Sequence, residues 1–263
     1  MAQARWPYVP IIAQLANSTP FRMLRSLLRD SWLFAIVGLL LWKNGQALRP
    51  QPDDPHEDCT APQCYYINLA SRVDRRQQFL ATVGQIGQPC ERINAANATA
   101  LHVPATEACR RSHLLALDRL EASGRPYGLV FEDDATWTQS ADEVKEMLCR
   151  IDDAMHRHPV VLLACNGHGA TMQKGEAWLQ TVDDCQTTSA YAVRRDYIDV
   201  LRDLWKQDSP ATALDQSWKA LQKSHTWAMT KPLIARQRAS YSNIEHKPVD
   251  YGVLVQMWNA TAV

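Results

Sequence analysis

The chain of 263 residues contains little glycine and has no net charge. It has 10 glycines, and its 28 basic residues (Lys plus Arg) balance 28 acidic ones. So few glycines exclude a collagen-like or glycine-rich protein. The balanced charge provides no general attraction for polyanions, so no nucleic-acid partner is predicted. Hydrophobic residues make up 46% and charged residues 21% of the chain, which is typical of a folded globular protein.

Zinc-binding cysteine patterns are also missing. None of the seven cysteines belongs to a CxxC pair, and no paired histidines lie near them, so a zinc site is not predicted. The odd number leaves at least one cysteine unpaired. In an oxidising compartment up to three disulfides can form, and the sequence does not assign their pairing. A set of buried free thiols is the alternative interpretation.

A hydrophobic block follows a basic N-terminal segment. Residues 32–42 carry no charge, but these eleven residues are fewer than the roughly 20 that a straight membrane span needs. A signal-peptide core or a buried helix therefore competes with an anchor. Tryptophans at both ends and arginines on the N-terminal side favour an anchor with a cytosolic N-terminus. We predict a basic cytosolic tail at 1–30 and an uncleaved signal anchor at 31–48, with an organelle transit peptide as the alternative.

A proline-rich segment separates this block from the rest of the chain. Residues 49–63 contain four prolines and five charges, which indicates a stem that does not pack. The remaining residues, 64–263, alternate strand and helix patterns in the manner of an α/β domain. Two N-glycosylation sequons, at Asn97 and Asn259, would lie on the lumenal side of the membrane in this topology.

Hydrophobic periodicity predicts the elements of this domain. Strands are expected at 64–69, 127–131, 159–165 and 188–193, and helices at 71–83, 106–122, 141–156, 196–206 and 212–223. Ser71 and Thr106 are the expected N-caps of the first two helices. The second helix is expected to present an apolar stripe that contains Ala108, Leu115 and Leu120.

Three consecutive carboxylates, Glu132, Asp133 and Asp134, follow the strand at 127–131. Alternation along an extended chain puts Glu132 and Asp134 on one face and Asp133 on the other. Neighbouring carboxylates raise one another's pKa and destabilise a fold unless a cation or hydrogen-bond donors compensate. Mg²⁺ or Mn²⁺ binds such oxygens and shares them with substrate phosphates. Because ligands bind at the carboxyl ends of strands in open α/β sheets, we interpret the three acids as a metal and nucleotide site. Acids that cap the next helix are the alternative.

A basic group, Arg72, Arg75 and Arg76, follows the first predicted strand. Guanidinium groups match the geometry of phosphate oxygens, so this group favours a bound diphosphate. A solvated helix face is the alternative interpretation.

Five segments resemble, in order and spacing, the motifs of glycosyltransferase family 25, which includes lipooligosaccharide and procollagen galactosyltransferases. They are a strand and helix at 66–76, an Ala-Cys…Ser-His helix at 108–114, the Glu-Asp-Asp strand end at 129–134, a strand at 188–193, and a closing segment with Pro232, Gln237 and 242–244. The chain departs from the family pattern at Ala108, where glycine is usual, and at Ala70, where an acid is common.

The resemblance implies a GT-A-like α/β sandwich with a mixed central sheet that binds a nucleotide sugar, uses a divalent metal and inverts the anomeric centre. It assigns residues to three roles, which overlap. The metal would be held by Asp134, Glu132 and His246. The nucleotide sugar would contact Asn68, Arg72, Arg76, His113, Glu132 and Asp133. The catalytic groups would be Asp215 and Asp133.

Two of these residues have ordinary structural alternatives. Inversion by direct displacement needs a general base opposite the leaving group, and Asp215 at a predicted helix start is the candidate. An acid in a first helical turn that only stabilises the helix is the alternative. His113 can orient a carboxylate or bind the sugar, or it can be a hydrogen-bonded histidine of the interior.

The sequence therefore predicts a single-pass type II membrane protein of the ER or Golgi. Its lumenal domain would transfer a hexose, with galactose favoured, from a UDP-sugar to a glycan or protein hydroxyl with Mn²⁺ or Mg²⁺. A bacterial inner membrane or an organelle is the alternative location. A metal-dependent phosphoester hydrolase and an inactive relative that acts as an adhesion or scaffold domain are the alternative functions.

Overall fold

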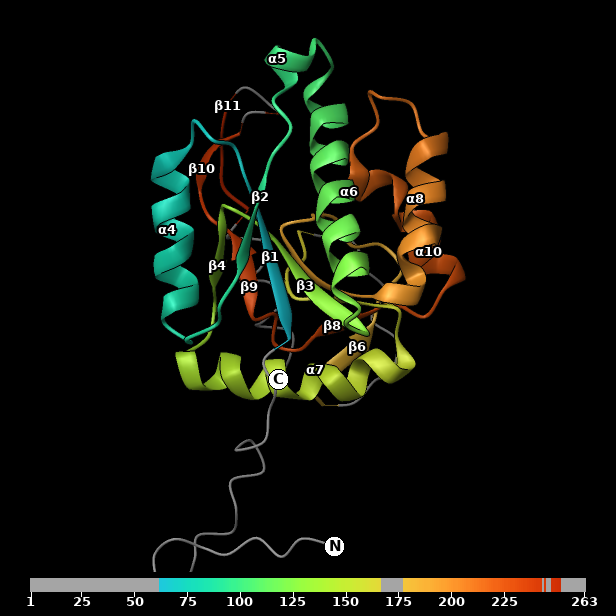
Figure 1. Cartoon of the computed structure of the whole chain (residues 1–263). Helices are drawn as coiled ribbons and strands as arrows, with labels where there is room; N and C mark the ends of the chain where they lie inside the picture. Colours follow the sequence, from blue (N-terminus) through green and yellow to red (C-terminus); the bar gives the residue numbers. More distant parts are fainter. Residues whose placement is uncertain (1–61, 167–176, 243, 245–246, 252–263) are drawn as a thin grey trace, which may run out of the picture. The chain divides into compact units, whose positions relative to one another are not determined.

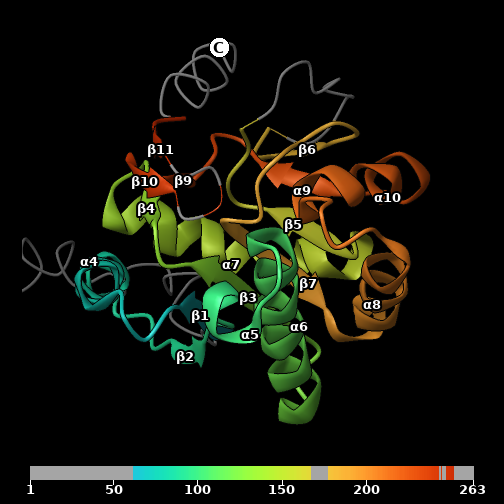
Figure 2. The same cartoon turned by 90° about the horizontal axis from the view of Figure 1, so that it is seen from above.

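Seven strands form one mixed sheet in the spatial order β2-β1-β3-β7-β5-β8-β6 (Figure 1 and Figure 2). The computed structural model describes residues 62–166, 177–242, 244 and 247–251, which all belong to one unit, Asp58–Val263. The strands are β1 (Gln63–Asn68), β2 (Glu91–Asn94), β3 (Tyr127–Glu132), β5 (Val160–Leu162), β6 (Leu179–Thr181), β7 (Ala190–Arg194) and β8 (Ala228–Thr230). The predicted α/β class with a mixed central sheet is confirmed.

The carboxyl ends of β1 and β3 lie side by side. β1 pairs in parallel with both β2 and β3, and its register places Ile67 opposite Glu132. Because β1, β2 and β3 are parallel, they end at the same edge of the sheet, whereas β7 runs antiparallel to β3 and to β5. Any polar residues that follow β1 and β3 are therefore brought together at that edge.

Two hydrophobic clusters cover the two faces of the sheet. Alternation along β1 sends Tyr65 and Ile67 into one cluster, and Cys64 and Tyr66 into the other. The first cluster packs against α6 (Ala105–Ser123) and α8 (Ile198–Gln207), and the second against α4 (Val73–Gly84) and α7 (Ala141–Arg157). Figure 2 shows α6 and α8 on the side of the sheet opposite to α7.

Shorter elements complete the described part. β4 (Ala135–Trp137) pairs antiparallel with β9 (Ala235–Gln237), and the register sets Ala135 opposite Gln237. This pairing brings Gln237 next to the acidic turn after β3. The other short elements are α5 (Ala98–Leu101), the 3₁₀ turn η1 (Arg195–Tyr197), α9 (Leu214–Ser217), α10 (Lys219–Ser224), β10 (Ser240–Ser242) and β11 (Lys247–Val249).

Helix ends differ from the expectation in two places. Neither Ser71 nor Thr106 is an N-cap, because α4 begins after Arg72 and α6 begins after Pro104. The Thr106 hydroxyl instead donates to the carbonyl oxygen of Pro210 at 2.6 Å. Leu115 is 45% exposed, so it does not belong to the buried stripe of α6.

Disulfides link the segments around the sheet. Cys64 in β1 is bonded to Cys90, which precedes β2, and Cys165 is bonded to Cys185. Among the described cysteines Cys109 is the free thiol. Of the two interpretations of the cysteines, the structure supports disulfides.

Replacing Cys64 and Cys90 together by alanine should lower the free energy of unfolding by roughly 3 kcal/mol. The bond closes a loop with a sequence separation of 26, and its removal restores the conformational entropy of the unfolded chain. Urea unfolding of the oxidised protein measures the change. Cys109→Ala is the control, with a loss below about 1 kcal/mol. A double variant that unfolds at the wild-type urea concentration contradicts the prediction.

The predicted membrane anchor at 31–48 lies outside the described residues, as do the tail at 1–30 and nearly all of the stem at 49–63. Within the residues that are described, no helix is both long and apolar enough to cross a bilayer. The anchor stays a prediction.

Candidate active site

A cavity of about 840 Å³ opens at the carboxyl ends of β1 and β3. Its wall combines carboxylates and guanidinium groups with small side chains from the loop after β2 and from α6. The charged lining residues are Arg72, Arg75, Glu132, Asp133 and Asp134. The structure therefore places all three predicted acids and two of the three predicted arginines in the wall of one cavity.

Asp133 is held by two donors. Its Oδ2 accepts from Asn68 Nδ2 at 2.7 Å, and its Oδ1 accepts from Arg75 at 3.0 Å. Burial raises the pKa of Asp133, and the bonds from Asn68 and Arg75 oppose this rise. Both oxygens of the carboxylate are thus engaged by the protein.

Asn68 positions Asp133 and does not line the cavity. Its side chain is 1% exposed, and its Oδ1 accepts from Arg92 at 2.9 Å. Because the amide is occupied on both sides, the predicted contact of Asn68 with the nucleotide is not supported. Arg92, from β2, was missed because an arginine in a short polar strand carries no pattern that points to a site.

Asp134 is the least compensated of the three acids. Its Oδ2 lies 3.2 Å from Arg75 and accepts from Gln237 at 3.2 Å, while its buried Oδ1 has no hydrogen-bond partner among the described residues. Burial, together with the charge of Glu132, raises the pKa of Asp134 to about 7, although Arg75 opposes the rise. Arg75 therefore does not fully offset the burial of this carboxylate and the charge of Glu132.

Glu132 is bonded to α6 and to the loop before β7. Its Oε1 lies 3.3 Å from His113 Nε2 and accepts from the Thr188 hydroxyl at 2.6 Å. Burial raises the pKa of Glu132, but the bonds from His113 and Thr188 outweigh it and lower the pKa overall. The expected separation of Asp133 from Asp134 is wrong, because β3 ends at Glu132 and the following turn carries Asp133 and Asp134 together to Arg75.

His113 is fully buried and orients Glu132. Its Nδ1 lies 3.0 Å from the Tyr191 hydroxyl. A tautomer with the proton on Nε2 satisfies both contacts, since Tyr191 then donates to Nδ1 and Nε2 donates to Glu132. Of the roles proposed for His113, the structure supports the orientation of a carboxylate.

The three arginines have different positions. Arg72 lines the cavity and pairs with Asp74 at 2.8 Å, and Arg75 inserts between Asp133 and Asp134. Arg76 is not among the lining residues, because the next residue of a helix points about 100° away. The predicted contact of Arg76 with a diphosphate is not supported, and Arg75 is the arginine that enters the site.

Asp215 lies next to this cavity, in a smaller one of about 350 Å³. The two cavities share Cys109, Glu132 and Gln237 among their lining residues. Asp215 is the second residue of α9, as expected for a helix start, and its Oδ2 accepts from the backbone N–H of Thr187 at 3.2 Å. Burial raises the pKa of Asp215, and the charge of Glu132 adds to the rise.

One group of three residues and one further carboxylate are candidates for holding a metal. Cys109, His113 and Glu132 place one ligand atom each within 4.8 Å of one another. This set fits poorly, because His113 is already bonded through both nitrogens and burial raises the pKa of the Cys109 thiol well above its usual value. The unpartnered oxygen of Asp134 fits a hard cation better. His246, the third predicted metal ligand, lies outside the described residues.

Replacing Arg75 by glutamine should destabilise the metal-free protein by about 3–5 kcal/mol at pH 8, because two buried carboxylates lose their ion pair. The loss should be smaller at pH 5, where Asp134, with its pKa raised to about 7, is protonated. Urea unfolding with a chelator at both pH values measures this. Arg76→Gln, the next residue on α4, is the matched control. Equal losses for Arg75→Gln at both pH values contradict the assignment.

No protein-family model matches the chain, and no curated protein sequence matches it. Solved structures align with it at low identity. A glycosyltransferase involved in the glycosylation of the major capsid of PBCV-1 has 9% identity and a TM-score of 0.46, with 74% of this chain and 98% of that chain covered. UDP-glucose pyrophosphorylase complexed with UDP-glucose has 10% identity and a TM-score of 0.42, with 77% and 98% covered. At these TM-scores and identities the structural similarity does not support a function for this chain, so any proposed function must rest on the geometry of the site.

Proposed function

We propose that the chain is a glycosyltransferase that moves a hexose, with galactose favoured, from a UDP-sugar to a hydroxyl group of a glycan or protein. The proposed reaction depends on a divalent metal and inverts the anomeric carbon. One observation carries the proposal: two arginines, Arg72 and Arg75, line a single cavity at the carboxyl ends of β1 and β3 together with three carboxylates, the buried Asp133 and Asp134 and the partly buried Glu132. This combination suits a ligand that is anionic and is accompanied by a cation.

The larger cavity is the proposed donor site. Its volume of about 840 Å³ lies within the range of about 300–1,000 Å³ that is usual for ligand pockets. Arg72 would bind phosphate oxygens from the rim, where its pair with Asp74 keeps the guanidinium in place. Asp133, held by Asn68, would fix Arg75 and does not need to contact the ligand.

Asp134 would be the main ligand of Mn²⁺ or Mg²⁺, with Glu132 nearby. Within the described residues, Arg75 is the only arginine or lysine ion-paired with the three carboxylates. Three carboxylates thus share one ion-paired cation. Burial, together with the charge of Glu132, raises the pKa of Asp134, so Arg75 alone does not compensate this acid. A divalent cation bound there would neutralise charge on the departing diphosphate.

Asp215 is the proposed general base. As the hydroxyl oxygen of the acceptor attacks the anomeric carbon, its proton passes to Asp215, and the bond between the sugar and UDP breaks with its electron pair leaving on UDP. Burial raises the pKa of Asp215, which makes the carboxylate a better proton acceptor. The N–H of Thr187 occupies Oδ2 and so orients the carboxylate. Asp133, the other catalytic candidate, is less suitable because both of its oxygens already accept hydrogen bonds.

We place the domain in an oxidising compartment, as a type II membrane protein of the ER or Golgi. The disulfides Cys64–Cys90 and Cys165–Cys185 support this placement, because such bonds persist in secretory and periplasmic compartments. They support a bacterial inner-membrane protein with a periplasmic domain equally well.

Calorimetric titration of the full chain with UDP-galactose, with and without Mn²⁺, tests the proposal. We expect binding that strengthens with Mn²⁺ in the wild type and in the control Asp203→Ala, whose side chain is exposed on α8. Asp134→Ala should lose the effect of Mn²⁺. Metal-independent binding, or no binding, would contradict the proposal and favour an inactive scaffold domain. Hydrolysis of the diphosphate to UMP and galactose 1-phosphate without an acceptor would favour a phosphoester hydrolase.

A further inference from the structure

The smaller cavity differs from the donor cavity in charge. Among the described residues that line it there is no arginine, lysine or histidine, and its two charged groups are the carboxylates of Glu132 and Asp215. The donor cavity beside it contains Arg72 and Arg75. The donor cavity therefore offers guanidinium groups with which an anionic ligand can pair, whereas the described lining of the smaller cavity offers none.

The wall of the smaller cavity contains an unsatisfied amide. Asn166 is 6% exposed, its Nδ2 donates to Gln237 Oε1 at 3.3 Å, and its buried Oδ1 has no partner among the described residues. Gln237 in turn donates to Asp134. An unpaired amide oxygen in a cavity wall is destabilising unless a ligand or water donates to it, so it marks a place for a hydroxyl group.

The loop that carries Thr187 is held in a strained conformation. Thr187 has φ 89°, a left-handed value that is unfavourable for a β-branched residue. Its N–H donates to Asp215, and the hydroxyl of the next residue, Thr188, donates to Glu132. The loop thus connects the two carboxylates of the cavity, and strain of this kind persists only where the surroundings enforce it.

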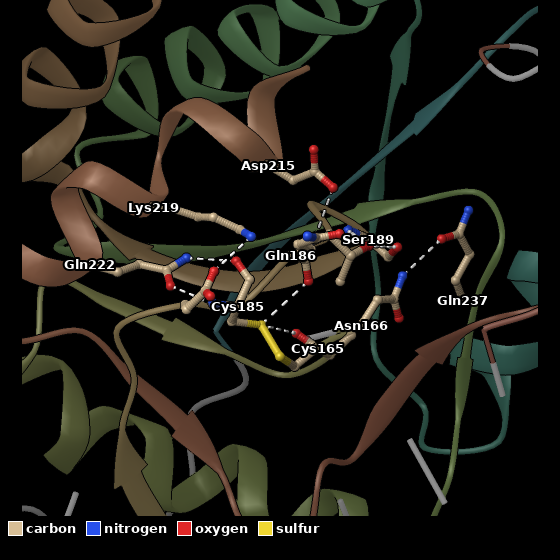
Figure 3. Close-up of a disulfide and its surroundings, with 12 residues drawn as sticks. Cys165, Asn166, Cys185, Gln186, Ser189, Asp215, Lys219, Gln222 and Gln237 are labelled. Atoms are coloured by element: carbon tan, nitrogen blue, oxygen red, sulfur yellow. Dashed lines mark hydrogen bonds and ion pairs between the residues drawn. A yellow bond between two sulfur atoms is a disulfide. The ribbon is translucent and has the colours of Figure 1, made fainter. Parts of the chain in front are cut away.

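The backbone two residues before Thr187 is held at Cys185 by a disulfide and by hydrogen bonds to one side chain. Cys185 is bonded to Cys165, and its backbone N–H and carbonyl oxygen both bond the side-chain amide of Gln222, at 2.7 and 2.9 Å. Figure 3 shows this disulfide with Asn166, Gln186 and Asp215 around it. Asn166 follows Cys165 directly, so the same disulfide anchors both polar sides of the cavity.

We propose that the smaller cavity is the acceptor site and that it takes a neutral, hydroxyl-rich ligand of the size of one or two sugar rings. Asn166 is its recognition residue, and Asp215 receives the proton of the reacting hydroxyl. The volume of about 350 Å³ suits a ligand of this size, and the two carboxylates exclude an acidic sugar. This inference rests on the proposed function, since it needs a donor in the adjoining cavity.

Transfer from UDP-galactose by the full chain, with Mn²⁺, tests the charge preference. The probes are methyl β-galactoside and methyl β-glucuronide, which are a neutral and an anionic pyranoside. We expect kcat/KM to be at least about tenfold higher for the neutral glycoside. Equal use of the two, or no transfer to either while UDP-galactose is hydrolysed, overturns the inference. Failure of UDP-galactose to bind at all would instead overturn the proposed function.

Two variants assign the residues. Asn166→Leu should raise KM for methyl β-galactoside about tenfold and should change the affinity for UDP much less, with Gln207→Leu on α8 as the control. An unchanged KM, or a loss of UDP affinity, overturns the role of Asn166. Gln216→Arg, at an exposed lining position, should shift the preference towards the glucuronide, whereas Gln216→Glu should not. Failure of that shift overturns the charge argument even if Asn166→Leu does not fold.

Discussion

Asp134→Asn should make the metal-free protein more stable at pH 8 and should abolish Mn²⁺-dependent binding of UDP-galactose. Asp134 is 3% exposed, and burial and the charge of Glu132 raise its pKa from 3.8 to about 7. At pH 8 the folded protein thus contains an ionised carboxylate that its surroundings disfavour by an amount of the order of a few kcal/mol. An uncharged amide of the same shape removes this penalty. Thermal unfolding with a chelator measures the gain.

The pH dependence distinguishes this cause from better packing. For an acid whose pKa is raised by folding, the folded state binds more protons than the unfolded state between the two pKa values, so stability falls as the pH rises. For Asp134 the penalty is absent at low pH, grows above the usual value of 3.8 and is complete above about 7. The advantage of Asp134→Asn should therefore be large at pH 8 and small at pH 5. Asp203→Asn, an exposed acid of α8, is the control and should show neither effect.

Mn²⁺ should reverse the order of stability. The metal binds only the folded wild type in the proposed arrangement, so it should raise the melting temperature of the wild type and leave Asp134→Asn unchanged. A variant that is less stable than the wild type at pH 8 without metal would show that Arg75 already compensates Asp134. The cation assigned to that carboxylate would then have no physical basis.

The position of the site could be predicted from the sequence, whereas the hydrogen bonds and ion pairs within it could not. Strand-end placement of Glu132, Asp133 and Asp134 follows from an apolar run that ends in three acids, and the parallel pairing of β1 with β3 brings them beside Arg72. The arrangement of the three acids depends on where β3 ends. If the extended strand continued past Glu132, Asp133 would lie on the opposite face from Glu132 and Asp134, as the sequence suggested.

Contacts between distant segments explain the other differences. Asn68 was expected to contact the nucleotide, but Arg92 and Asp133 approach it from β2 and from the turn after β3 and occupy its amide. Gln237 reaches Asp134 only because β9 pairs with β4. Thr187 adopts a left-handed backbone that no local residue type signals. Such contacts depend on tertiary pairing, which a single sequence does not specify.

Asp215→Asn should lower kcat by about 10²–10⁴-fold while the affinity for UDP-galactose stays at the wild-type value. The amide removes the proton acceptor, yet its oxygen can still accept from the Thr187 N–H, so the loop and the cavity should be preserved. Steady-state kinetics and titration with the donor measure the two effects.

The pH profile and a second acid decide whether the loss is that of a base. Because burial raises the pKa of Asp215, kcat/KM of the wild type should rise with pH through that pKa, and Asp215→Asn should lack this rise. Asp133→Asn is the informative comparison. Both carboxylate oxygens of Asp133 are bonded in the wild type, so this substitution should weaken donor binding through Arg75 and leave the pH profile of kcat/KM largely as it is. If Asp133→Asn instead removes the rise and Asp215→Asn retains the wild-type rate, the base is Asp133, and the acceptor must approach from the side of Arg75.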